Sequence, residues 1–165
     1  MVEDAPDPID VWKTFSNVSK TWFRLAEADL RPLGLSLLEV RALRLLSREG
    51  PQPMVRLSEE LLVSQPAITG IVDRLQRQGL AERARDRADR RVVHVRITAA
   101  GRRTLTRAIA IHRSFVRESL DHLPPREAER LSGILTRLGD ALAAYEGQRE
   151  AARAQARSHA VRVRR

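Results

Sequence analysis

The sequence predicts a mainly α-helical fold with a small β hairpin. Apolar residues recur every three or four positions over four stretches, which is the period of a helix with one buried face. Residues 93–97 instead alternate apolar and polar side chains, as a half-buried strand does. With 165 residues and 42% hydrophobic content, the chain is long enough to bury about 70% of its unfolded surface in a core.

The first predicted helix covers residues 9–30 and has one strongly apolar face. The large side chains of this face recur at spacings of three and four: Trp12, Phe15, Val18, Trp22 and Leu25. Such a face either belongs to the core of its own domain or is covered by a partner subunit, and both alternatives stay open. Residues 31–34 end the helix, because Pro32 disfavours helical geometry in the residue before it.

Two shorter helices follow. The second begins at Ser36, which together with Glu39 matches the capping box S-x-x-E, and it ends at Gly50-Pro51. The third is expected over about residues 54–62.

The fourth helix has two contrasting faces. Ser64 is a good N-cap, Pro66 lies in the first turn where its missing N–H costs nothing, and Gly79 closes the helix. One face is apolar: Ile68, Ile71, Val72 and Leu75. The opposite face is polar: Gln65, Thr69, Gly70, Arg74 and Arg77. The third and fourth helices therefore meet across a tight turn as a helix-turn-helix.

A basic hairpin comes directly after this helix pair. Residues 80–84 and 93–97 are expected to be its strands, and the segment between them carries too much charge to be core.

The remainder of the chain is predicted to be helical up to residue 145. Thr98 is a suitable N-cap for a helix to about residue 120, and a last helix over about 126–145 has an apolar stripe with a spacing typical of helix-to-helix packing. Residues 146–165 contain six arginines and no stripe, so we expect frayed helix and disorder there.

The charge indicates an anionic partner. The chain has 30 basic and 21 acidic residues, a formal net charge of +9, and eight arginines fall within residues 82–103. All but two of the basic residues are arginine, and a GC-rich genome also produces this bias. The positions of the arginines along the chain are therefore more informative about a partner than their number. A helix-turn-helix followed by a basic hairpin, or wing, is a winged helix-turn-helix, whose second helix is suited to the major groove of duplex DNA.

The fourth helix offers candidate contacts of two kinds. Gln65 has the amide geometry to bond adenine, and the Thr69 methyl group is suited to thymine. Arg74 and Arg77 lie further along the helix and are expected to reach phosphates.

The wing tip offers a third kind of contact. Arg90 and Arg91 are candidates for a narrow minor groove, and Asp89 is placed to hold a neighbouring guanidinium. A charged hairpin alone is usually solvated surface, but its position immediately after the candidate reading helix favours a role in binding.

Three segments carry a resemblance to a known family. They are residues 63–75 (VSQPAITGIVDRL), residues 79–83 (GLAER), and the wing, where DRR at 89–91 leads to ITAAG at 97–101. In their order and spacing, from about Leu35 to Arg103, they resemble the MarR family (multiple antibiotic resistance regulators) of bacterial transcription factors.

The resemblance implies a homodimeric repressor whose two winged lobes bind a pseudo-palindromic operator. It implies that the helix start faces the major groove, that Arg91 enters the minor groove and that Asp89 orients this arginine. The implied major-groove residues include Ser64, Gln65, Pro66, Ala67 and Thr69. Two positions depart from the family: Leu62 replaces a usual glycine, and Pro53 stands where a Ser or Thr cap is common.

An obligate dimer built from the N- and C-terminal helices is also expected on physical grounds, because one small lobe can hardly cover both apolar stripes. The alternative is packing of the first helix on the last within one chain. The candidate dimerisation residues are Trp12, Phe15, Leu131, Ile134, Leu135, Leu138 and Leu142. The expected organisation is a dimerisation helix (1–34), a winged helix-turn-helix (35–98), dimerisation helices (99–145) and a basic tail (146–165).

Other functions are disfavoured. The chain has no Cys, its four His have no metal-ligand spacing, and no catalytic motif is present, so we expect neither a metal, nor a cofactor, nor an enzyme. No run is long enough to cross a bilayer, and a cytoplasmic protein is expected. The resemblance implies a small aromatic or phenolic effector, although no motif marks its site. The alternative function is a non-specific architectural DNA-binding protein, because a charge of +9 favours any duplex.

Overall fold

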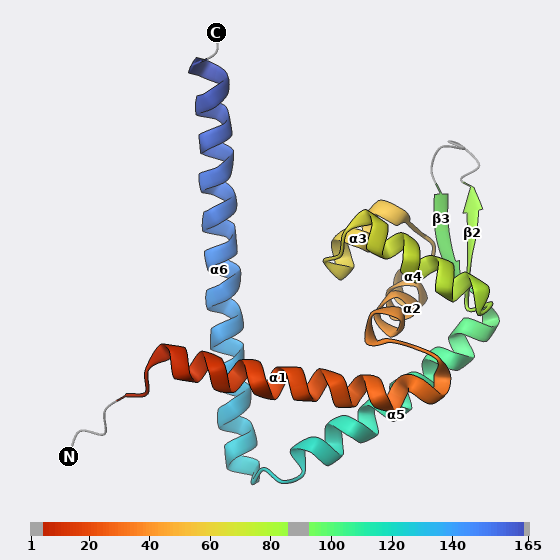
Figure 1. Ribbon diagram of the computed structural model, residues 1–165, viewed down its shortest axis with the longest axis horizontal. Helices are drawn as coiled ribbons and strands as arrows, with labels where there is room; N and C mark the ends of the chain where they lie inside the picture. Colours follow the sequence, from red (N-terminus) through yellow and green to blue (C-terminus); the bar gives the residue numbers. More distant parts are fainter. Residues whose placement is uncertain (1–4, 86–92, 164–165) are drawn as a thin grey trace. The chain divides into compact units, whose positions relative to one another are not determined.

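The computed structural model of the protein describes residues 5–85 and 93–163, and it forms two compact units, Met1–Arg117 and Glu118–Arg165. Its elements follow the order shown in Figure 1: α1 (Pro8–Leu30), η1 (Arg31–Leu33), α2 (Leu37–Glu49), β1 (Gln52–Pro53), α3 (Met54–Leu61), α4 (Gln65–Arg77), β2 (Ala81–Arg85), β3 (Val93–Ile97), α5 (Ala99–Leu120) and α6 (Pro125–Val163). The mainly α fold with a small β wing is confirmed.

The helix starts follow from local capping chemistry. The Asp7 carboxylate accepts a hydrogen bond from the Ile9 N–H at 2.9 Å and caps α1. Both bonds of the predicted capping box are present at α2, where Glu39 Oε2 accepts from the Ser36 N–H at 2.8 Å. The segment between α1 and α2 is a 3₁₀ turn that ends at Gly34 in the left-handed region (φ 66°).

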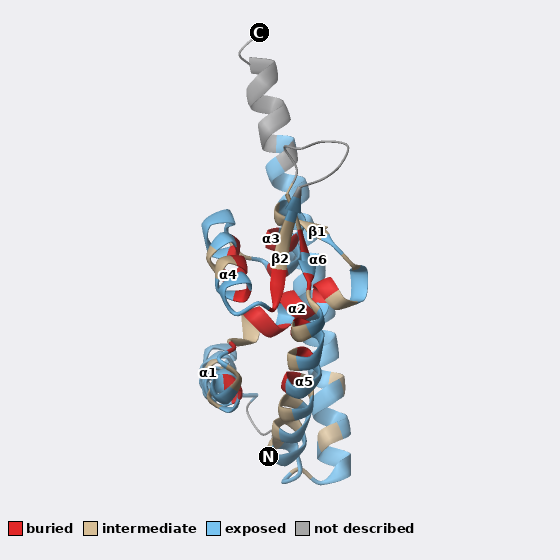
Figure 2. Ribbon diagram, turned by 90° about the vertical axis from the view of Figure 1, so that its right-hand side faces the viewer, coloured by how far each residue is buried: buried red, intermediate tan, exposed pale blue. Residues whose placement is uncertain are grey.

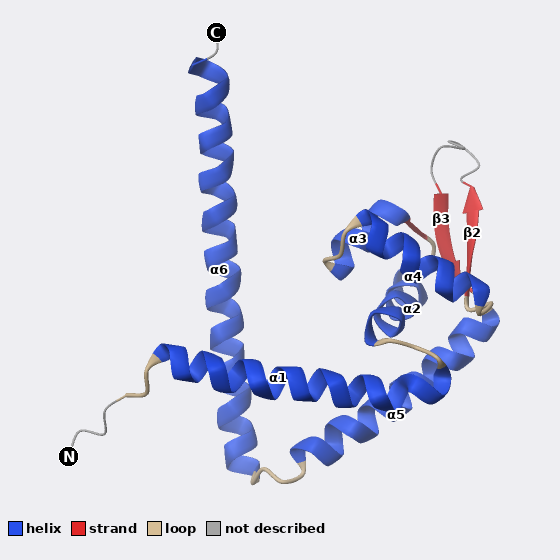
Figure 3. Ribbon diagram, viewed as in Figure 1, coloured by secondary structure: helices blue, strands red, loops and turns tan. Residues whose placement is uncertain are grey.

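The wing is part of a three-stranded antiparallel sheet with the order β1-β3-β2 (Figure 3). The strands β2 and β3 pair along their full length, from Ala81 opposite Ile97 to Arg85 opposite Val93. Strand β1 was not predicted, because two residues are too few for a periodic signal. Its proline is tolerated because β1 lies at an edge of the sheet.

A single apolar cluster holds the winged part of the first unit together. Figure 2 shows the buried residues gathered on α2, α4 and the strands. The largest fully buried side chains are Leu30, Leu43, Leu46, Leu57, Ile68, Leu75, Val72 and Val95. The apolar face predicted for α4 is therefore confirmed as core, and it fixes the rotation of this helix about its axis.

The C-terminal part differs from expectation. Thr98 caps α5 as predicted, because its Oγ1 accepts from the Gly101 N–H at 3.0 Å. The helix α6, however, does not end near residue 145 and continues to Val163. The expected frayed and disordered tail is thus helical over residues 146–163, since this stretch contains no proline and consists largely of Ala, Arg, Gln and Glu, which are strong helix formers.

Candidate nucleic-acid interface

A tight turn joins α3 to α4. Leu62 adopts the left-handed conformation (φ 56°, ψ 45°), and the Val63 N–H donates to the Ser58 carbonyl at 3.0 Å. Ser64 then caps α4 by accepting from the Ala67 N–H at 3.4 Å. The predicted helix-turn-helix is present, and Leu62 preserves the backbone geometry for which glycine is better suited.

The two faces of α4 have opposite environments. Its apolar face is buried against the core, while the residues predicted to meet DNA lie outward. Ser64, Gln65, Pro66, Ala67, Thr69, Arg74 and Arg77 are exposed, and Gly70 is half-buried. An exposed polar helix face on a rigid base has the form that groove recognition requires.

The polar groups of Gln65 and Thr69 are engaged within the protein. Gln65 Nε2 donates to Ser58 Oγ on α3, and this hydroxyl, which is buried, donates in turn to the Val55 carbonyl at 2.7 Å. Thr69 Oγ1 donates to the Gln65 carbonyl at 2.9 Å. The hydroxyl of Thr69 therefore already has a partner, and the bond to Ser58 uses one of the two Nε2 hydrogens of Gln65 and turns its amide toward α3.

Two arginines near α4 form internal ion pairs. Arg74 Nε lies 2.6 Å from Glu39 Oε1 on α2. Arg83 Nη1 on β2 lies 2.5 Å from Asp73 Oδ1 and donates to Gln76 Oε1 at 3.1 Å. These contacts fasten α4 to α2 on one side and to the wing on the other.

The root of the wing is described, but its tip is not. On the strands, Arg96 Nε pairs with Glu82 Oε1 across the hairpin at 2.8 Å. The predicted contacts of Asp89, Arg90 and Arg91 fall within residues 86–92, outside the described residues.

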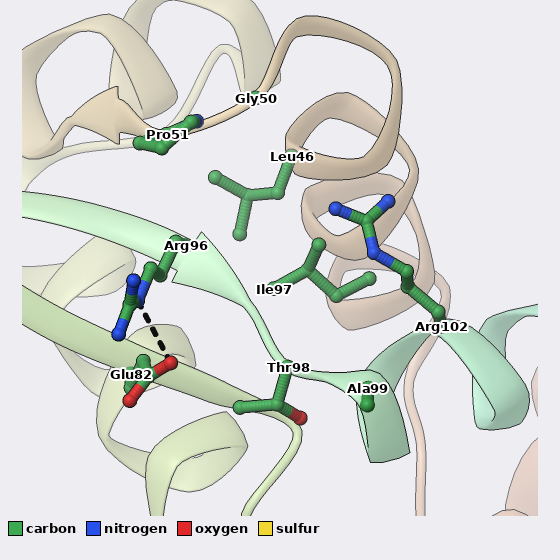
Figure 4. A pocket seen from close by; sticks show the side chains of 9 residues that line it. All are labelled: Leu46, Gly50, Pro51, Glu82, Arg96, Ile97, Thr98, Ala99 and Arg102. Carbon is green, nitrogen blue, oxygen red and sulfur yellow. Dashed lines mark ion pairs between the residues drawn. The ribbon is translucent and has the colours of Figure 1, made fainter.

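A pocket of about 360 Å³ lies at the base of the wing (Figure 4). Its lining comes from α2 and the loop after it, from β2 and β3, and from Thr98 and the start of α5: Leu46, Gly50, Pro51, Glu82, Arg96, Ile97, Thr98, Ala99 and Arg102. Arg96 is paired with Glu82, and Arg102 donates to Ser47 Oγ at 3.3 Å. Both guanidinium groups thus have protein partners.

The aromatic residues of α1 fall into two environments. Trp22 packs edge-to-face on Phe115 of α5, with ring centroids 5.1 Å apart, whereas Trp12 is 61% exposed. In this group, His112 stacks on Phe115, and the buried His112 Nδ1 has no hydrogen-bond partner within the described part of the chain.

All of the candidate dimerisation residues are exposed in the single chain. On α1 these are Trp12 and Phe15, and on α6 they are Leu131, Ile134, Leu135, Leu138 and Leu142. These seven side chains are therefore exposed in one copy of the molecule, whereas Trp22 of the same α1 stripe packs on Phe115.

Sequence reasoning missed the partners that hold the interface. Glu39 was identified only as part of a capping box and Arg83 only as part of the segment GLAER, and Ser58 was not singled out. Because the Arg74–Glu39 contact spans 35 positions of sequence, no local pattern predicts it. The one signal in the sequence was that Glu39 and Arg74 each stand next to an apolar position of a short helix, where a charged side chain lies close to the core.

Comparisons with known proteins place the chain among transcriptional regulators. Residues 33–92 match the model of the MarR family. The transcriptional regulator BldR from Sulfolobus solfataricus is 35% identical, with a TM-score of 0.65 over 78% of this chain and 94% of its own.

Two further structures share the fold at lower identity. A mutant of MarR from E. coli, complexed with operator DNA, is 24% identical, with a TM-score of 0.70 over 79% of this chain and 94% of its own. The organohalide-sensing regulator RdhR, in its 2,4-dichlorophenol-bound form, is 19% identical, with a TM-score of 0.71 over 86% of this chain and 88% of its own. Every helix that the structure describes is too short or too polar to cross a membrane.

Proposed function

Because the chain belongs to the MarR family of winged helix-turn-helix transcriptional regulators, we propose that it binds a pseudo-palindromic operator as a homodimer and represses transcription there. The observation that carries this proposal is the division of α4 into a buried apolar face and an exposed polar face. A dimer seated on a promoter excludes polymerase from the same DNA, which supports repression.

The start of α4 is the proposed base-reading surface. Its residues are Ser64, Gln65, Pro66, Ala67, Thr69 and Gly70, and the Thr69 methyl group is free to contact a thymine methyl because only the hydroxyl is bonded. Arg77 is exposed at the end of the helix and is the proposed phosphate contact.

The wing is the proposed minor-groove element. Arg91 and Arg90 are the proposed minor-groove arginines, and Asp89 is proposed to orient the Arg91 guanidinium. The ion pairs at the wing root, between Arg83 and Asp73 and between Arg96 and Glu82, support this role because they tie the hairpin to α4 and brace its two strands.

Dimerisation through the terminal helices is the proposed means of placing two copies of α4 on one duplex. We assign residues 1–34 and 99–145 to assembly and residues 35–98 to DNA binding. The exposed stripes of α1 and α6 support this organisation, because a second copy would remove both from water. Two recognition helices then lie about one turn of DNA (~34 Å) apart.

Release by a small aromatic or phenolic effector is a further part of the proposal. The rings of Trp22 and His112, which both pack on Phe115, support it, because His112 Nδ1 has no hydrogen-bond partner in the described part of the chain and is suited to a phenol hydroxyl. The bound 2,4-dichlorophenol of RdhR is chemistry of this kind. Titration with 2,4-dichlorophenol should quench tryptophan fluorescence in the wild type and much less in Trp22→Phe.

A gel-shift experiment tests the proposal as a whole. The probe is a duplex covering the promoter region of the protein's own gene, with random duplex of equal length as competitor, at physiological salt. We expect a preference of at least ~1000-fold for one site. Equal affinity for both duplexes would contradict a regulator and favour an architectural DNA-binding protein, for which the +9 charge is sufficient.

The same experiment with Arg91→Ala tests the wing. The variant should bind the operator more weakly while its dimerisation and melting temperature stay at wild-type values, because a hairpin tip contributes little to the core. Wild-type affinity would remove the wing from the mechanism. Since its target is the chromosome, the proposed compartment is the cytoplasm.

A further inference from the structure

The ion pair between Arg74 and Glu39 joins α4 to the start of α2. Glu39 is only 3% exposed, and its carboxylate is satisfied on both oxygens. Oε1 accepts from Arg74 Nε at 2.6 Å, while Oε2 accepts from the N–H and hydroxyl of Ser36 at 2.8 and 3.1 Å. A buried carboxylate in this position depends on its cation, because ionised groups are strongly disfavoured in an apolar surrounding.

The contact uses the inner nitrogen of the guanidinium. Nε lies closest to the helix backbone, so this bond turns the Arg74 side chain toward α2, which passes beneath α4 (Figure 1). The side chain is 47% exposed. Its position on the polar face of the helix is the reason why the sequence alone suggests a phosphate contact.

A second bond on the same face of α4 strengthens the link. Gln78 follows Arg74 by one helical turn, and its Nε2 donates to the Gly34 carbonyl at 2.9 Å. Gly34 belongs to the turn that leads from α1 into α2. The recognition helix is therefore held at two successive turns by the segment that follows the dimerisation helix.

We propose that Arg74 is a positioning residue, which sets the orientation of α4 through Glu39 and does not neutralise a DNA phosphate. This inference rests on the proposed function, in which α4 reads the operator. Arg77, in the same last turn of α4, provides the contrast: it is exposed, and no ion pair joins it to another residue of the described segments.

The two roles differ in the salt dependence of binding. Each phosphate contact contributes about 0.9 to the slope of log affinity against log salt concentration. We therefore measure this slope on the promoter duplex of the protein's own gene for the wild type, Arg74→Gln, Glu39→Gln and Arg77→Gln. Because the dimer carries the substitution twice, the Arg77→Gln control should lower the slope by about 2, which is about 0.9 for each of the two lost contacts.

Arg74→Gln and Glu39→Gln should instead weaken operator binding by about tenfold or more at an unchanged slope. Their effects should not add in the double variant, because both break the same ion pair. Binding to random duplex should stay at the wild-type value, whereas simple unfolding would weaken both complexes equally. A slope lowered by about 2 in Arg74→Gln, as for two lost phosphate contacts per dimer, with wild-type affinity in Glu39→Gln, would overturn the proposal.

Arg74→Lys sharpens the distinction. Lysine contacts a phosphate as a point charge but lacks the planar Nε donor that Glu39 binds. A positioning role predicts that Arg74→Lys binds as weakly as Arg74→Gln, and full recovery by lysine would contradict it.

Hydrogen exchange separates this inference from the proposed function. In the free protein, Glu39→Gln should accelerate amide exchange in α4, while the melting of α6 is unchanged. Unchanged exchange in α4 overturns the positioning role even if the operator is recognised. If the wild type shows no operator preference, the proposed function fails. Faster amide exchange in α4 of Glu39→Gln would still support the role of the Arg74–Glu39 ion pair in holding α4.

Discussion

Asp73 on α4 and Arg83 on β2 join the recognition helix to the wing through an ion pair of 2.5 Å. The same Arg83 nitrogen, Nη1, also donates to Gln76 Oε1, one turn further along α4. In the proposed complex the helix and the hairpin contact different grooves of the duplex, so we expect this arginine to influence the angle between two parts of one binding surface.

Neutralising Asp73 should impair binding more than stability. Both side chains are partly exposed, so Asp73→Asn should cost less than about 1 kcal/mol of unfolding free energy. Operator affinity should fall about tenfold, because the wing is no longer held at the angle that α4 requires. The control is Glu82→Gln, which breaks the Arg96 pair within the hairpin but leaves α4 attached. Equal losses of affinity in the two variants would contradict a link specific to α4.

The bond between Gln65 and Ser58 should influence base discrimination. Ser58→Ala removes the acceptor that holds the Gln65 amide on α3, and the released amide is then available to a base edge. We expect a changed preference at the base pair beneath Gln65 and a change of less than about 1.5 kcal/mol in stability. Binding to a library of operators with single substitutions measures this preference. An unaltered profile would contradict an influence of this bond on base discrimination.

The sequence predicts elements well where the controlling interaction is local. The Ser36–Glu39 capping box spans four residues, and the apolar face of α4 repeats within one helix, so both are visible as patterns. The partners of Arg74, Gln65 and Arg83 were not predictable in this way, because each lies on another element and the choice depends on tertiary packing. The continuation of α6 was missed for a different reason: a charged stretch without an apolar stripe was taken for a tail, although its helix propensity is high.

Leu62 stores backbone strain that glycine would relieve. Its left-handed conformation costs an L-residue about 1–2 kcal/mol, and the side chain is 88% exposed, so little packing compensates for this cost. Leu62→Gly should stabilise the protein by up to about 1 kcal/mol after the greater chain entropy of glycine is deducted. Leu62→Ala, which keeps a Cβ atom, should show no such gain. Thermal melting followed by circular dichroism compares the two, and equal melting temperatures would contradict the strain.

Gly101 is required in the first turn of α5, where this helix passes close to Leu80 and to the end of β3. A Cβ atom at this position would lie 2.1 Å from the Leu80 carbonyl oxygen and 2.8 Å from Ile97 Cγ1. The same carbonyl accepts from the Thr98 N–H at 3.0 Å, so it cannot retreat without losing this bond. Gly101→Ala should lower stability by about 2 kcal/mol. Gly139→Ala is the control, because nothing lies within 4 Å of a Cβ there and alanine favours a helix, so this variant should melt at or above the wild-type temperature.

Leu138 tests the assembly on which the spacing of the two recognition helices depends. This side chain is 43% exposed and lies in the middle of the apolar stripe of α6, where a second copy would bury it. Because a symmetric dimer contains the substitution twice, Leu138→Glu should raise the dimer dissociation constant at least about 100-fold, as expected from losing about 1.5–3 kcal/mol of leucine burial in each subunit. Thr136→Glu places the same charge on the opposite side of the helix and should leave the dimer intact. Sedimentation velocity over a range of concentrations distinguishes them: unaltered dimers of Leu138→Glu would exclude this stripe from the interface, and dissociation of both variants would indicate a general effect of charge on α6.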